Sequence, residues 1–218
     1  MSIDKRIYRR MAGYPVVIDL AGRGCVVIGG GTVGERKVDG LLAVGAVVTV
    51  VSPTLSEPLD ALAKRGEIRH LRRRYRRGDL ARATLAFVAT GDGRVAAAVA
   101  REGRRRGVWV NAADDPEHCD FFLPSVLRRG QLLIAVATGG TSPALARAVR
   151  EEIARRLPAD YAVLTETVAE VRREMRARGV RADASTWSRA LSAEISRLGG
   201  DAPVGEARAR LLQSLGAA

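Results

Sequence analysis

Three glycines at fixed spacing give the sequence its clearest capacity for chemistry. They lie in Gly29-Gly-Gly-Thr-Val-Gly34, which follows a short apolar run and precedes a helical pattern. In that setting the spacing G-x-G-x-x-G is typical of dinucleotide binding. Gly29 permits a tight turn, Gly31 lets the backbone approach a pyrophosphate, and Gly34 lets the helix pack closely on its strand. The pyrophosphate would meet the positive helix N-terminus, although a tight turn without a ligand has the same spacing.

The usual ribose-binding residue of such a site is absent. Dinucleotide sites carry Asp or Glu at the end of the second strand, but here that strand ends in Val51-Ser52-Pro53-Thr54. Ser52, Thr54 or backbone groups could take the place of the carboxylate. Arg or Lys for the 2′-phosphate of NADP is also absent at this point, so the sequence favours NAD over NADP.

A carboxylate follows a later strand of the same region. Strand 108–111 ends in Asn111-Ala-Ala-Asp114-Asp-Pro, and ligands of open α/β sheets bind beyond the carboxyl ends of the strands. Asp114 could there transfer a proton or contact a metal ion, but Asp and Pro also favour a plain turn. Asn111 and Thr90, which follows the preceding strand, are further candidates for contacting the cofactor, and Thr90 could equally belong to a turn.

His118 and Cys119 come directly after this carboxylate segment. A His, a Cys and acidic residues so close together suggest metal binding, but no second His or Cys cluster supplies the remaining ligands. We therefore expect no metal site and a structural role for both residues. Cys25, inside an apolar run, is expected to be a small core residue, and His70, among arginines, to lie on a solvated face.

These candidate residues depend on alternating strands and helices for their positions. Apolar β-branched runs predict the strands, and apolar residues at helical spacing predict the helices between them. Strand, glycine turn, helix and strand in close succession form a βαβ unit, whose crossover is right-handed. The alternation predicts a Rossmann-like, doubly wound parallel sheet of the α/β class over residues 14–113, with strands at 25–29, 46–51, 68–71, 85–89 and 108–111 and helices at 32–44, 55–65 and 94–106.

The pattern changes after residue 113. Two apolar runs at 121–127 and 131–138, joined by Arg128-Arg-Gly130, predict a hairpin. Ser142 followed by proline predicts the start of a helix, because these residues favour the N-cap and first-turn positions. The sequence thus predicts three regions: a NAD-binding domain at 1–113, a hairpin and helix at 114–157, and a helical C-terminal domain at 158–218, with helices at 143–157, 159–177, 185–198 and 204–215.

The composition is strongly basic. The 218 residues carry a formal charge of +12, and all but three of the 36 basic residues are arginine. A hydrophobic fraction of 47% excludes wholesale disorder, no apolar run reaches the ~20 residues of a membrane span, and the N-terminus lacks the apolar stretch of a signal peptide. We therefore expect a cytoplasmic protein without a membrane partner.

The charge by itself fits nucleic acid, an anionic membrane surface or an acidic small molecule. Nine of the basic residues lie between residues 64 and 82. They are a candidate surface for steering an anion, or a solvated face without such a role.

Five motifs, taken in order, resemble one known family. They are Tyr14-Pro-Val-Val-Ile-Asp-Leu20, Gly29-Gly-Gly-Thr-Val-Gly-Glu-Arg-Lys37, Asn111-Ala-Ala-Asp-Asp-Pro116, Phe122-Leu-Pro-Ser125 and Gly139-Gly-Thr-Ser-Pro-Ala144. The chain resembles the precorrin-2 dehydrogenase / sirohydrochlorin ferrochelatase family, which includes the dehydrogenase module of siroheme synthase. The resemblance covers residues 14–157, and the rest is similar only in being helical.

The resemblance implies NAD-dependent oxidation of precorrin-2 to sirohydrochlorin, and in some members insertion of Fe²⁺ into the product. Asp114 matches the catalytic aspartate of the family, which serves as general base or proton shuttle in both steps. Thr32, Val33, Pro53 and Thr54 match family positions that contact NAD. Such contacts would explain why no ribose carboxylate is present.

The resemblance also implies a homodimer. The segment after the nucleotide domain is exchanged between subunits in the family, so 114–157 is expected to be a dimerisation region. Precorrin-2 carries eight carboxylates, which suit arginine forks, and Gly139, Gly140, Thr141 and Ser142 at a helix N-terminus could bind one of them. Some members are phosphorylated at a serine where this chain has Thr138.

Two other functions share parts of this pattern. A regulatory NAD-sensing domain would have the glycine turn but would need no carboxylate at Asp114. A nucleic-acid-binding protein would explain the charge, but aromatic residues make up only 4% of the chain and no stacking motif or recognition-helix pattern is present. We therefore expect an enzyme with a tetrapyrrole substrate and no nucleic-acid partner.

Overall fold

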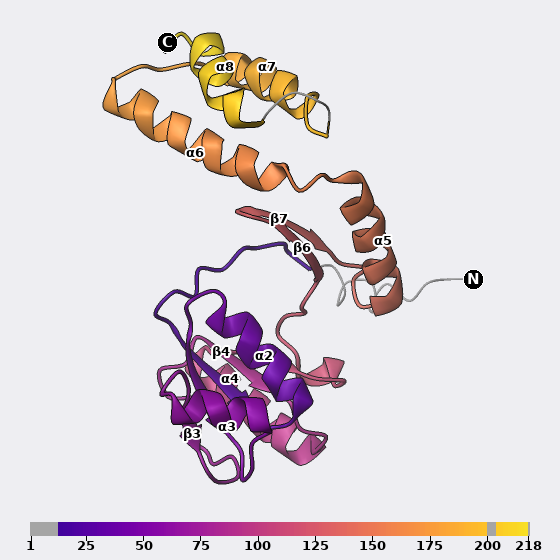
Figure 1. Ribbon diagram of the computed structural model, residues 1–218. Helices are drawn as coiled ribbons and strands as arrows, with labels where there is room; N and C mark the ends of the chain where they lie inside the picture. The colour runs from indigo at the N-terminus through magenta and orange to yellow at the C-terminus, as the bar shows by residue number, and fades with distance from the viewer. Residues whose placement is uncertain (1–12, 200–203, 218) are drawn as a thin grey trace, which may run out of the picture. The chain divides into compact units, whose positions relative to one another are not determined.

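The computed structural model describes residues 13–199 and 204–217 (Figure 1). The chain divides into two compact units, Met1–Phe122 and Leu123–Ala218. Within the described residues, no helix is both long and apolar enough to cross a bilayer.

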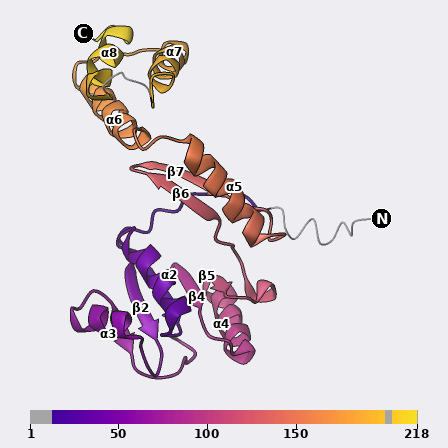
Figure 2. The same ribbon diagram turned by 45° about the vertical axis from the view of Figure 1, so that its right-hand side comes forward.

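The first unit is a parallel sheet covered by helices on both faces. Its elements are β1 (Gly24–Ile28), α2 (Thr32–Leu42), β2 (Val47–Val51), α3 (Glu57–Lys64), β3 (Arg69–Leu71), β4 (Leu85–Val88), α4 (Gly93–Arg106) and β5 (Trp109–Ala112), followed by a 3₁₀ turn at Pro116–His118. The strands lie in the order β3-β2-β1-β4-β5 and all pair in parallel. Helices α2 and α3 pack on one face and α4 on the other (Figures 1 and 2). The doubly wound sheet predicted from the sequence is confirmed.

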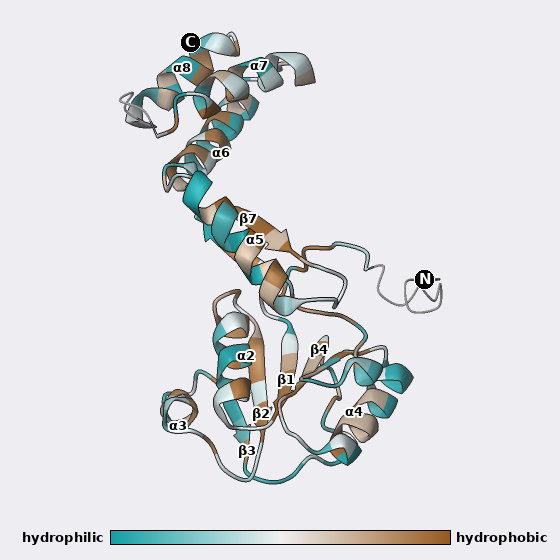
Figure 3. Cartoon of the chain, turned by 90° about the vertical axis from the view of Figure 1, so that its right-hand side faces the viewer, coloured by the Kyte–Doolittle hydropathy of each residue, from teal (hydrophilic) through white to brown (hydrophobic). Residues whose placement is uncertain are grey.

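Alternate side chains of each strand enter two separate cores. Val27 of β1 packs with Val38 of α2 and Leu59 of α3, whereas the neighbouring Val26 packs with Val99 of α4. Burial of each such side chain contributes about 1.5–3 kcal/mol. Because both faces are covered, the strands must be apolar on both sides, which explains their nearly continuous apolar runs. Figure 3 shows hydrophobic, brown stretches in the sheet, whereas β3 is largely hydrophilic.

Helix α4 begins and ends at residues suited to those positions. The Asp92 carboxylate accepts hydrogen bonds from the backbone N–H groups of Arg94 at 2.9 Å and Val95 at 3.4 Å. These are N–H groups that the helix itself leaves unpaired. Gly107 follows the last turn with φ of 70°, in the left-handed region that favours glycine. The caps place the start of α4 just beyond the carboxyl end of β4.

The second unit begins with the predicted hairpin. Strand β6 (Ser125–Arg129) pairs antiparallel with β7 (Leu132–Val136), and helix α5 (Pro143–Arg156) follows. Gly130 lies in the two-residue turn with φ of 56°, which glycine accepts readily at the first turn position. Of the apolar side chains in the hairpin and α5, only those of Leu127 and Ala146 are buried.

The C-terminal helices have a core of their own. They are α6 (Tyr161–Ala177), α7 (Ala184–Ile195) and α8 (Ala207–Ser214), with a 3₁₀ turn at Val204–Glu206. Val171 and Met175 of α6 pack with Leu211 of α8. The buried Glu194 of α7 forms an ion pair with Arg210 of α8 at 2.9 Å. The three helices are therefore joined by both an apolar cluster and a charged pair.

The hairpin begins later than the sequence indicates. The apolar run predicts a strand from residue 121, but β6 starts at Ser125. Phe121 instead packs edge-on against Phe87 of β4, with ring centroids 5.5 Å apart, and its carbonyl accepts a hydrogen bond from Asn111 at 2.9 Å. The first compact unit therefore extends to residue 122, whereas the sequence analysis places the change of region after residue 113.

Candidate functional site

The glycine turn between β1 and α2 is built so that three of its positions, Gly29, Gly30 and Gly34, have no room for a Cβ. Gly29 has φ of 118°, and a Cβ there would collide with the carbonyl of Ala89. A Cβ on Gly34 would collide with the carbonyl of Gly29. Gly31 differs, because a Cβ on it would meet nothing within 4 Å. The backbone therefore leaves no space beside Gly29 and Gly34, but there is free space beside Gly31. At this point the first N–H groups of α2 have no partner within the helix.

Hydrogen bonds hold this turn to the segment after β2. The Gly29 N–H donates to the Val51 carbonyl at 3.0 Å, and the Ser56 N–H donates to the Gly30 carbonyl at 2.7 Å. The Ser56 hydroxyl donates to the Glu35 carboxylate of α2 at 2.9 Å. Gly30 also lies against the Thr54 carbonyl so closely that a Cβ would collide with it. Gly30 could not be singled out from the sequence, because G-x-G-x-x-G leaves that position unspecified.

The chain changes from buried to exposed directly after β2. Ser52 is buried, and Pro53 and Thr54 are exposed. The Ser52 carbonyl accepts a hydrogen bond from His70 Nε2 at 2.9 Å. The expectation that His70 is a solvated face residue is therefore wrong: its partly buried ring joins β3 to the end of β2.

Thr90 and Asn111 lie beyond β4 and within β5. Thr90 is partly buried, and its Oγ1 accepts a hydrogen bond from the Asp92 N–H at 3.4 Å. Asn111 is buried, and its Nδ2 donates to the Phe121 carbonyl at 2.9 Å. The amide of Asn111 therefore holds the segment that follows the 3₁₀ turn against the sheet.

Asp114 stands exposed just beyond the carboxyl end of β5. Its φ is 58°, in the left-handed region that Asp tolerates better than most residues. Ala113, immediately before it, is fixed by an N–H bond to the Val88 carbonyl at 2.9 Å, and Asp115, immediately after it, pairs with His118 at 2.6 Å. Across the described part of the chain, no side chain or backbone group hydrogen-bonds to the Asp114 carboxylate. A firmly held backbone thus presents a carboxylate that can bind or transfer a proton.

Cys119 packs beneath this turn as a structural residue, and Cys25 is buried in the first core, as the sequence predicts. The thiol of Cys119 donates to the Ala112 carbonyl at 3.2 Å. Burial raises the pKa of Cys119, so its reactive thiolate form is disfavoured. In residues 13–199 and 204–217, no group of three His, Cys, Asp or Glu side chains is arranged to hold a metal ion.

Lys37 of α2 is the functional candidate that the sequence analysis missed. Its ammonium lies 5.7 Å from the centre of the Phe87 ring, and the side chain is partly buried. Burial, with Arg36 adding to it, lowers the pKa of Lys37, while the charges of Cys119 and Asp114 act in the opposite direction. Because the charge of Asp114 acts on the Lys37 ammonium, a cation lies in the surroundings of this carboxylate. A lysine inside the apolar stripe of α2, next to the buried Val38, was the signal in the sequence.

The glycine pair of the second unit precedes helix α5. Gly139 and Gly140 have φ of 59° and 81°, and Thr141 donates its N–H to the Thr138 carbonyl at 3.1 Å. Ser142 caps the helix by accepting a hydrogen bond from the Leu145 N–H at 3.1 Å. The Thr138 hydroxyl bonds to both the N–H and the carbonyl of Ser142, so it is occupied within the turn.

Two family models match consecutive parts of the chain. Residues 16–125 match a family described as putative NAD(P)-binding, and residues 129–156 match the central region of sirohaem biosynthesis proteins. The first match covers half of the chain and contains the glycine turn and Asp114. The chain belongs to the family described as putative NAD(P)-binding. The second match contains the Gly139–Ser142 turn of this family member.

Curated relatives of this family member include longer proteins. It is 42% identical over 168 residues to siroheme synthase of Methylobacillus flagellatus and 35% identical over 206 residues to that of Methylococcus capsulatus. These matches cover 77% and 94% of the chain but only 36% and 44% of the relatives. Among solved structures, SirC, a precorrin-2 dehydrogenase, matches 93% of the chain and 98% of its own length, with a TM-score of 0.69 and 27% identity.

Proposed function

We propose that the protein is a NAD-dependent dehydrogenase that oxidises precorrin-2 to sirohydrochlorin. The observation that carries the proposal is the pairing of an open glycine turn with an unpartnered carboxylate, Asp114, beyond the same edge of the sheet. The match to SirC over nearly the whole of both chains supports the same reaction. The longer siroheme synthases support the pathway, although this chain spans only 36% and 44% of the length of the two relatives.

The residues at the turn fit a dinucleotide. The open side of Gly31 and the free N–H groups of Thr32 and Val33 can receive a pyrophosphate at the positive end of α2. Pro53 and Thr54, which are exposed after the end of β2, are available to the ribose, whereas Ser52 is buried, and none of the three is a carboxylate. When bound there, NAD supplies a hydride acceptor.

Asp114 serves as the base in this proposal. Oxidation of a carbon–nitrogen or carbon–carbon single bond removes a hydride and a proton, and the proton needs an acceptor close to the substrate. The exposed carboxylate of Asp114 is available for it, because it has no hydrogen-bond partner among the described residues. Lys37 acts as a positioning residue, because its ammonium provides a positive charge in the surroundings of Asp114.

Fe²⁺ insertion into sirohydrochlorin is a second reaction that the same carboxylate could assist. The metal ion is then a substrate, and two pyrrole N–H protons must leave the macrocycle as it enters. Asp114 can accept one of them by the same proton transfer. We place both reactions in the cytoplasm.

Exposed apolar residues in the second unit support a homodimer. Leu123, Val126, Leu145 and Val149 are 52%, 39%, 54% and 39% exposed, and all lie in or beside the hairpin and α5. Few side chains of this part are buried, so it lacks a core of its own. A second copy of the chain could cover these residues.

The test is anaerobic turnover of precorrin-2 with NAD⁺, followed through NADH and sirohydrochlorin absorbance. We expect wild-type protein to form both, and Asp114→Ala to lower kcat by about 100-fold or more, as loss of a general base does. Asp115→Asn is the matched control, because its amide can still accept a hydrogen bond from His118. No turnover by wild type would overturn the dehydrogenase proposal, and full activity of Asp114→Ala would overturn the role of the carboxylate. NADH binding without turnover would instead favour a regulatory domain.

A further inference from the structure

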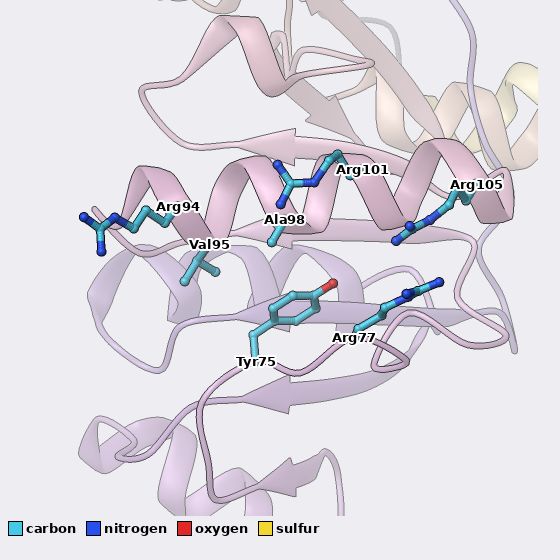
Figure 4. Close-up of a pocket in the computed structure, with 7 residues that line it drawn as sticks. All are labelled: Tyr75, Arg77, Arg94, Val95, Ala98, Arg101 and Arg105. Atoms are coloured by element: carbon cyan, nitrogen blue, oxygen red, sulfur yellow. The ribbon is translucent and has the colours of Figure 1, made fainter.

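A basic groove lies between helix α4 and the segment that follows β3. Its volume is about 470 Å³, a size that suits a single small molecule. Arg94, Arg101 and Arg105 of α4 line one wall, and Tyr75 and Arg77 line the other (Figure 4). The three α4 arginines follow one another at seven and four residues, so they share one face of the helix.

The arginines of this groove are unlike many others of the chain, because they have no acidic partner. Arg73 binds the Asp79 carboxylate through two hydrogen bonds of 2.7 and 2.8 Å, and Arg106 binds Glu102 at 2.6 Å. In contrast, none of the four groove arginines forms an ion pair or side-chain hydrogen bond with any residue that the structure describes. No carboxylate lines the groove, so four guanidinium groups repel one another unless an anion lies between them.

A buried carboxylate fixes the shape of the groove. Glu102 of α4 is 1% exposed and accepts hydrogen bonds from the Tyr75 hydroxyl at 2.6 Å and the Gly78 N–H at 2.9 Å. Burial would raise the pKa of Glu102, but these bonds and the one from Arg106 outweigh it and lower the pKa. The segment that carries Tyr75 and Arg77 is therefore clamped to α4, and the groove is formed before any ligand binds.

The groove starts at the edge of the sheet that holds the candidate site. Arg94 is in the first turn of α4, directly after the loop that leaves β4 at Thr90. From there to Arg105 the arginines extend along about 16 Å of helix, at 1.5 Å per residue. A single phosphate can contact only one or two of these side chains. An anion with several acid groups arranged around a flat ring can contact more of them, with the Tyr75 ring beside it.

We propose that this arginine groove is a docking site for the carboxylates of the tetrapyrrole, separate from the site where the macrocycle reacts. The inference rests on the proposed function for the identity of the anion. Guanidinium groups bind carboxylates through paired hydrogen bonds, which fits the unpartnered arginines. The groove holds the acid side chains of an arriving substrate and raises its concentration at the adjoining edge of the sheet.

Binding of uroporphyrin tests the proposal without requiring turnover. This octacarboxylate has a fully oxidised macrocycle, so it reports docking through its fluorescence while no NADH is formed. We expect Arg101→Gln/Arg105→Gln to weaken binding about tenfold at about 20 mM NaCl, and by less at about 300 mM, because salt screens exposed charges. The matched control is Arg69→Gln/Arg104→Gln, which removes the same charge from exposed positions outside the groove.

The possible results distinguish failure of the docking site from failure of the proposed dehydrogenase reaction. Weaker binding in the groove variant alone, with the unfolding midpoint unchanged, supports the docking site even if precorrin-2 is not oxidised. Equal loss in both double variants would show a general charge effect and overturn it. Displacement of uroporphyrin by equimolar tripolyphosphate or single-stranded DNA would assign the groove to phosphates, and would also overturn it.

Discussion

Two charged side chains from different elements carry the proposed chemistry at the sheet edge. Asp114 reaches it from the turn after β5 and Lys37 from the inner face of α2. The left-handed backbone at Asp114 favours Asp, Asn or Gly there, and only Asp among them supplies a base. The backbone conformation and the proposed proton chemistry are therefore compatible with the same residue.

Lys37→Met tests the positioning role of the ammonium. We expect kcat/KM to fall about tenfold, since the variant removes the titratable positive charge from the surroundings of Asp114. The pH profile of kcat/KM should also change shape, which a purely packing role would not cause. Lys64→Met is the control, because Lys64 is exposed and pairs with Asp60 at 2.7 Å far from the candidate base in sequence. An unchanged pH profile in Lys37→Met would contradict the assignment.

Helix α2 contains two glycines, Gly34 and Gly40, that differ in the space available for a Cβ, so the same substitution can be compared at both. Gly34→Ala places a methyl group against the Gly29 carbonyl, so we expect a loss of about 1–3 kcal/mol in the free energy of unfolding and weaker NADH binding. Gly40, in the same helix, has nothing within 4 Å of a built Cβ. Gly40→Ala should therefore stabilise the helix by up to about 1 kcal/mol. Urea unfolding and NADH titration of both variants check this, and equal effects would refute the close approach.

The clamp between α4 and the segment after β3 predicts a pH dependence. Because folding lowers the pKa of Glu102, its contribution to stability is full above the unfolded value of about 4.3 and is lost as pH falls through the folded pKa. Glu102→Gln should lose about 1–3 kcal/mol near pH 7 and less near pH 4. Glu67→Gln, which breaks an exposed ion pair with Arg65, should change stability by under about 1 kcal/mol. A pH-independent difference in urea unfolding would count against the clamp.

Elements formed by local patterns could be predicted from the sequence, and contacts between distant segments could not. The glycine turn and the strands follow from runs of a few residues, and Cys25 is in the core as expected. The rotation of α2 that brings Lys37 to Phe87, and the bond from His70 to Ser52, depend on tertiary packing. The roles assigned to Asp114 and to the Gly139–Ser142 turn stay predictions.

At the scale of the whole molecule, the apolar surface of the second unit predicts the oligomeric state. We expect a mass of twice 23.3 kDa by light scattering, and a shift toward the single-chain mass for Leu145→Glu, which places a charge in the proposed interface. Val47→Glu is the control, since Val47 is 60% exposed in the first unit. A single-chain mass for the wild type would overturn the homodimer.

The scarcity of lysine gives this arginine-rich protein an unusual chemical selectivity. Its three lysines are Lys5, which is outside the described residues, Lys64 in an exposed ion pair, and Lys37 with a lowered pKa. Because its pKa is lowered, a larger share of the Lys37 amine than of an ordinary lysine amine is uncharged near neutral pH. Only the uncharged amine is nucleophilic. In protein whose α-amino group has been blocked, a small acylating reagent should therefore modify Lys37 ahead of Lys64 and attach a spectroscopic label in the surroundings of Asp114 without introducing a new residue.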